Sequence, residues 1–77
     1  MVYLRWTNHA RQRCVEMGLA PATVEEVFVH PELDYPSGPK YPGQRVCTKG
    51  DLCIPYSPRP GDEKIIITIL WNRKDHR

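Results

Sequence analysis

The chain has 77 residues, a formal net charge of +2, a pI near 8.5 and 40% hydrophobic residues. A chain this short buries only about 60% of its unfolded surface, so residues 1–77 form one domain with no room for a separate cofactor domain. The mild positive charge permits an anionic partner but does not require one.

The chain shows no sign of membrane insertion or export. No stretch approaches the roughly 20 apolar residues that span a bilayer, and Met1–Arg5 lacks the apolar core of a signal peptide. We therefore expect a cytosolic protein with no membrane partner. Cys14, Cys47 and Cys53 are odd in number and lack the spacing of a zinc site, so we expect no metal and no cofactor.

The first half of the chain predicts a short strand followed by a helix. Val2–Trp6 is rich in strand formers and is either a first strand or an N-terminal arm. Thr7 is a favourable N-cap, because its hydroxyl can accept a hydrogen bond from a free N–H group in the first turn. The helix then extends to about Met17, where Gly18 provides the left-handed C-terminal conformation.

A second helix is predicted to begin at Pro21, a residue favoured in the first turn. Val24, Val27 and Phe28 have the i, i+3, i+4 spacing of a helix face that packs on a core. Pro31 ends this helix. The short connection between the two helices predicts a helical hairpin.

Two strands, Gln44–Thr48 and Leu52–Tyr56, are predicted to form a β-hairpin. The register depends on the turn. A three-residue turn, Lys49–Asp51, separates polar from apolar side chains better than a two-residue turn, so we expect it. That register places Cys47 opposite Cys53, where a disulfide is geometrically possible; in a reducing compartment both thiols are instead small buried hydrophobes.

A proline-rich loop is expected at residues 36–43, before the hairpin. Lys64–Trp71 is the most apolar of the predicted strands and is expected at the centre of the sheet. Strict alternation puts two sets on opposite faces: Ile65, Ile67, Ile69 and Trp71, and Ile66, Thr68 and Leu70. The predicted order is βααβββ. The predicted fold class is therefore a two-layer α+β domain, with the N-terminal helical hairpin packed on a small antiparallel sheet.

Four short motifs follow one another along the first half of the chain: His9-Ala10-x2-Arg13, Gly18-Leu19, Val24-Glu25-Glu26-Val27 and Pro31-Glu32. Together with an arginine-containing strand and a threonine in the last strand, this order resembles a small family of uncharacterised domains. That family is similar to the RelE- and BrnT-type bacterial toxins of the barnase–EndoU–colicin–RelE group of metal-independent ribonucleases. The resemblance covers nearly the whole chain and implies a RelE-like fold.

The resemblance implies a catalytic set made of His9, Arg13, Arg45 and Thr68. RNA cleavage without a metal needs a base, cationic donors for the phosphate and an acid for the leaving oxygen. A histidine suits either proton transfer. Arg13 follows His9 by one helical turn and could clamp the phosphate, with Arg45 as a second contact and Thr68 orienting a phosphate oxygen. Each of the four also has an ordinary structural role available, as a surface residue, an ion-pair partner or a buried hydroxyl.

Further substrate contacts are expected from basic residues: Lys49, Arg73 and His76. Ribosome-dependent RelE toxins carry a lysine-rich helix and a tyrosine after the last strand, both of which this chain lacks. The resemblance therefore does not imply ribosome-dependent cleavage.

Two functions fit these observations. The first is a toxin that acts as a metal-independent endoribonuclease, with RNA as substrate and an antitoxin as partner. The second is a non-catalytic interaction module of the same fold, of phage or mobile-element origin, that binds and inhibits a host protein. Toxicity that survives replacement of both His9 and Arg13 would favour the second. Oligomerisation would add to the modest stability of so short a chain under either function.

Overall fold

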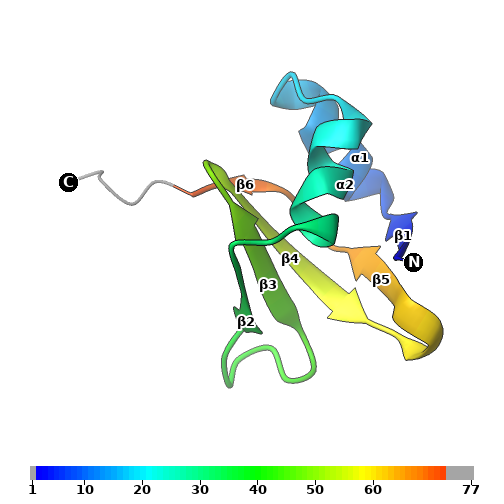
Figure 1. Cartoon of the computed structure of the whole chain (residues 1–77), viewed down its shortest axis with the longest axis vertical. Coiled ribbons are helices and arrows are strands. Elements are labelled where there is room, and N and C mark those ends of the chain that lie inside the picture. The colour runs from blue at the N-terminus through cyan, green and yellow to red at the C-terminus, as the bar shows by residue number, and fades with distance from the viewer. Residues whose placement is uncertain (1, 73–77) are drawn as a thin grey trace.

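The computed structural model describes residues 2–72, which form two helices on one face of a mixed sheet (Figure 1). This two-layer α+β arrangement confirms the predicted fold class. The elements in chain order are β1 (Tyr3–Trp6), α1 (Asn8–Glu16), α2 (Pro21–Val29), β2 (Leu33–Pro36), β3 (Arg45–Lys49), β4 (Leu52–Pro58), a 3-10 turn (Pro60–Asp62), β5 (Glu63–Ile66) and β6 (Leu70–Trp71).

Both helices begin and end where the sequence predicts. The Thr7 hydroxyl caps α1 by accepting a hydrogen bond from the Ala10 N–H at 3.1 Å. Gly18 follows the C-cap with a φ of +68°, and Pro21 is the first residue of α2. No helix among residues 2–72 is long and apolar enough to cross a membrane.

The strand order is β1-β5-β4-β3-β2, and β6 pairs with β4 beyond the end of β5. The predicted all-antiparallel sheet is wrong at β1, which runs parallel to β5. Parallel strands need a long connection between them, and here α1, α2 and strands β2 to β4 lie between β1 and β5 in the chain. β2 is a strand that the sequence did not predict; it lies at the other edge, where Pro36 is tolerated.

The β3–β4 hairpin turns through two residues, Gly50 and Asp51, so the predicted three-residue turn is wrong. Gly50 has a φ of +57°, the conformation that the first central position of a two-residue hairpin turn requires. The observed register pairs Cys47 with Ile54 instead of with Cys53. Cys47 is therefore buried under the helices while Cys53 lies on the other face, and both thiols are free.

The predicted last strand is interrupted by a bulge. Between the pairs Tyr56–Ile66 and Cys53–Leu70, β4 has two residues and the last strand has three. The extra residue breaks the predicted alternation. As a result Ile66 and Ile69 are both fully buried against the helices.

The core lies between the helices and the inward face of the sheet. The buried residues from the two layers are Ala10, Cys14, Val24, Val27 and Phe28 from the helices, and Cys47, Leu52, Ile54, Tyr56, Ile66 and Ile69 from the strands.

Candidate functional site

Two side chains, from the N-cap of α1 and from α1 itself, bind backbone carbonyls in and next to the bulge. The Thr7 hydroxyl lies 2.8 Å from the carbonyl oxygen of Ile66 and 3.3 Å from that of Ile67. The Arg13 Nε–H group donates to the carbonyl oxygen of Ile69 at 3.1 Å. A buried carbonyl without a donor costs free energy, so these contacts fix α1 to the last strand.

Three of the four predicted catalytic residues border this junction. Arg13 binds the carbonyl of the residue that follows Thr68, and Thr68 is itself half-buried within the bulge. His9 lies one turn before Arg13 on α1 and is exposed, and its imidazole makes no hydrogen bond or ion pair with residues 2–72. The structure therefore brings Arg13 and the segment around Thr68 together, with His9 on the adjoining turn of the helix.

Arg13 is only partly engaged by its neighbours. Besides the Ile69 carbonyl it has one ion pair, from Nη1 to Glu16 at 3.4 Å, with side chains 29% and 49% exposed. An exposed pair of this kind stabilises a protein by less than about 1 kcal/mol. The Nη2 group has no acceptor among residues 2–72. The guanidinium can therefore donate to a phosphate through Nη2 while Nε–H stays bonded to the Ile69 carbonyl.

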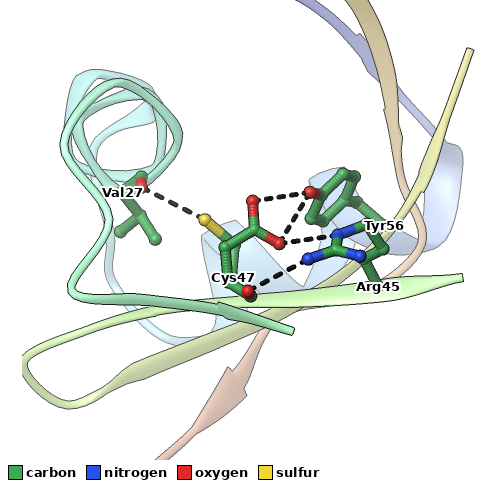
Figure 2. Close-up of polar contacts among 5 residues, drawn as sticks. Val27, Arg45, Cys47 and Tyr56 are labelled. Carbon is green, nitrogen blue, oxygen red and sulfur yellow. Dashed lines mark hydrogen bonds and ion pairs between the residues drawn. The ribbon is translucent and has the colours of Figure 1, made fainter. Parts of the chain in front are cut away.

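Arg45 belongs to a different polar group, on the β2 side of the sheet. Its Nε–H donates to the Asp34 carboxylate at 2.9 Å and its Nη2 to the Asp34 carbonyl at 3.0 Å. The Tyr56 hydroxyl lies 2.9 Å from both oxygens of the same carboxylate. Figure 2 shows the Tyr56 hydroxyl and the Arg45 guanidinium converging on one carboxylate. Arg45 shares no hydrogen bond with His9, Arg13 or Thr68.

Tyr56 is the buried centre of this second group. Its burial, followed by its hydrogen bond to Asp34, raises its pKa to about 12. The ring meets Phe28 edge-on, with centroids 5.3 Å apart, and the Lys64 ammonium lies 5.1 Å from its centroid. A phenol with this pKa keeps its proton near neutral pH, so we interpret the group as a structural connection between β2, β3 and β4.

Cys47 lies beside the same carboxylate and is also protonated near neutral pH. Its thiol contacts the Val27 carbonyl oxygen at 3.3 Å (Figure 2). Burial, reinforced by the negative charge of Asp34, raises its pKa to about 11. A thiol rather than a thiolate at this position is a packing residue and not a nucleophile.

The remaining predicted contacts lie apart from the bulge. The Lys49 ammonium binds Glu26 at 3.2 Å and the carbonyl of His30 at 3.1 Å, and so joins the end of β3 to α2. Arg73 and His76 lie outside the described residues. Within residues 2–72 no group of three or more histidine, cysteine or acidic residues is placed to hold a metal ion.

Sequence reasoning missed the Asp34–Tyr56 contact. Asp34 is on β2, the strand that the sequence did not predict, and no motif links it to Tyr56. One sequence signal was compatible with an edge strand at this place: residues 32–35 are flanked by Pro31 and Pro36.

Comparison with known proteins finds likeness in fold alone. No protein-family model and no curated protein sequence matches this chain. Two solved structures are similar to it over nearly their whole length. One is a copper-bound mutant toxin from Helicobacter pylori, with 18% identity, 99% of this chain and 100% of that chain covered, and a TM-score of 0.71. The other is a chain of the toxin–antitoxin complex RelBE2 from Mycobacterium tuberculosis, with 20% identity, 99% and 98% covered, and a TM-score of 0.69.

Proposed function

We propose that this protein is a toxin of the toxin–antitoxin type and that it cleaves RNA as a metal-independent endoribonuclease. The observation that carries the proposal is the full-length likeness of the fold to two solved structures, a toxin and a chain of a toxin–antitoxin complex. By the same reasoning the proposed partner in the resting cell is a cognate antitoxin.

The proposed reaction takes place on the surface between α1 and the bulge. A base removes the proton of a ribose 2′-hydroxyl, and the resulting oxygen attacks the adjacent phosphorus. The phosphorus–oxygen bond to the 5′-oxygen breaks, a cyclic phosphate forms, and the leaving oxygen takes up a proton. His9 is the proposed proton-transfer group, since imidazole accepts and donates protons near neutral pH.

Arg13 is the proposed phosphate ligand in this site. Its Nε–H is fixed by the Ile69 carbonyl, so the planar guanidinium is held in place before substrate binds. Thr68 would orient a phosphate oxygen from within the bulge. Arg45 and Lys49, together with Arg73 and His76, are proposed to contact more distant phosphates of the strand.

The proposal is tested by inducing expression in a bacterial host and following growth and bulk RNA integrity. His9→Ala is the sharpest variant, because the exposed imidazole has no partner within residues 2–72 and its loss should leave folding intact. His30→Ala is the matched control, since His30 is an exposed histidine at the far end of α2.

We expect arrest and RNA decay with wild type and His30→Ala, and loss of both with His9→Ala. The double variant His9→Ala/Arg13→Ala should be equally inactive. Arrest with intact RNA, or arrest that persists in both the single and the double variant, would reject the ribonuclease and favour an interaction module that inhibits a host protein.

A further inference from the structure

The strand β1 forms an open edge of the sheet. It is the first strand in the order β1-β5-β4-β3-β2, and within residues 2–72 it pairs with β5 alone (Figure 1). An edge strand presents unpaired N–H and C=O groups that can bind another strand. At the opposite edge, β2 ends in Pro36, which cannot donate such a bond, whereas β1 contains no proline.

The side chains of β1 alternate in a way that suits a further strand. Tyr3 and Arg5 are exposed on the face of the sheet that the helices leave free, and Arg5 forms an ion pair with Glu63 at 3.0 Å. The alternate residues are half-buried toward α2. They line a groove of about 230 Å³ together with residues of that helix: Val2, Leu4, Trp6, Glu25 and Val29. Val29, which borders this groove beside Glu25, is 55% exposed.

We infer that a second copy of this chain binds here, with the two β1 strands paired antiparallel about a twofold axis at Leu4. Directly opposite residues of two paired strands point to the same face of the sheet. The even-numbered residues of β1 point toward the helices, so the helices of both copies lie on the same face only if even-numbered residues pair with even-numbered ones. With the axis at Leu4, Leu4 faces Leu4, Val2 faces Trp6, and Tyr3 faces Arg5.

This register is more complementary than the one with its axis at the next residue, Arg5. An axis at Arg5 would place two arginines directly opposite each other, which is destabilising. The axis at Leu4 instead puts each arginine against the tyrosine ring of the other copy, twice in the dimer, and joins apolar residues on the helix side. Four residues of strand give a small interface, so the dimer is expected to be weak, with a dissociation constant in roughly the micromolar range or above.

The first test is sedimentation equilibrium of the purified chain over a concentration series. Tyr3→Arg places like charges opposite each other in both symmetric pairs, and we expect it to weaken the dimer about tenfold. Within one copy residue 3 pairs with Glu63, so the new arginine should not destabilise the monomer, which thermal unfolding checks. Tyr3→Phe, which keeps the ring, should dimerise like wild type.

The second test reports the register, in a Cys53→Ser background that removes the one thiol outside the core. Tyr3→Cys and Arg5→Cys chains should form an intermolecular disulfide when mixed under mild oxidation, and neither should do so alone. A wild-type chain that is monomeric throughout, a Tyr3→Arg chain that dimerises normally, or cross-linking of one variant with itself would each overturn the inference. None of these outcomes depends on whether the chain cleaves RNA.

Discussion

Tyr56 donates its hydroxyl to the Asp34 carboxylate, lying 2.9 Å from each oxygen, and thereby joins a buried ring of β4 to an exposed edge strand. All four residues of β2 are exposed, so this strand has little apolar burial to hold it. Arg45 binds the same carboxylate from β3. The attachment of β2 to the sheet therefore depends on Asp34 as well as on the backbone ladder.

Alkaline pH should weaken the fold through Tyr56. Its pKa is raised from 10 to about 12 in the folded state, so the folded protein holds this proton more tightly than the unfolded chain does. The resulting stabilisation is complete below pH 10 and is lost as the pH rises through about 12. We expect the free energy of unfolding, measured by urea titration, to fall across this range.

Tyr56→Phe is the control for the alkaline effect. It should remove the part of the decline that belongs to the phenol, while Cys47, whose pKa is raised from 9 to about 11, still contributes between those values. Equal slopes for wild type and Tyr56→Phe between pH 10 and 12 would show that the phenol does not carry the effect.

Replacing Asp34 should release β2 at neutral pH. Asp34→Ala leaves the Tyr56 hydroxyl and the Arg45 Nε–H group without their carboxylate acceptor, at a cost of about 2 kcal/mol in the free energy of unfolding. Amide hydrogen exchange of residues 33–36 should accelerate more than that of β4. Asp51→Ala, in the exposed hairpin turn, is the matched control and should change stability by less than about 0.5 kcal/mol.

Elements set by local chemistry were predictable from the sequence. The limits of α1 follow from the Thr7 hydroxyl and from Gly18, and the start of α2 follows from Pro21. The His9–Arg13 spacing was also a local property, because residues four apart share one face of a helix.

Elements set by tertiary pairing were not predictable in this way. Polarity alone predicts the wrong hairpin register, because Arg45 and Lys49 lie on the buried side of the sheet. Their charged ends still reach acidic partners at its margins. The bulge depends on how the last strand meets β4 and α1, and no residue within 67–69 signals it. The bond from Arg13 to the Ile69 carbonyl spans 56 residues and could not be read from helix periodicity.

The three thiols should differ in reactivity. Cys14 and Cys47 are buried, and burial raises the pKa of both, whereas Cys53 is only half-buried. Burial also raises the pKa of Cys53, so we expect slow alkylation of Cys53 in the native protein and labelling of the other two only on unfolding. Mass spectrometry after iodoacetamide treatment measures this order. A Cys47–Cys53 disulfide in a non-reducing peptide map would contradict the observed hairpin register.

The Thr7 hydroxyl should contribute more to the free energy of unfolding than an ordinary helix cap does. It accepts from the Ala10 N–H and donates to the Ile66 carbonyl, so one group serves both α1 and the bulge. Thr7→Val keeps the shape but loses both bonds, and we expect about 2 kcal/mol lower stability by chemical denaturation. Thr7→Ser keeps the hydroxyl and should cost less than about 0.5 kcal/mol.

The same pair of variants tests whether the bulge positions the proposed site. If the surface between α1 and the bulge binds RNA, Thr7→Val should lower ribonuclease activity even at a temperature where the variant is fully folded, because Arg13 and Thr68 lose their fixed spacing. Thr7→Ser should retain activity. Full activity in a folded Thr7→Val protein would mean that the bonds from Thr7 stabilise the fold and do not organise the site.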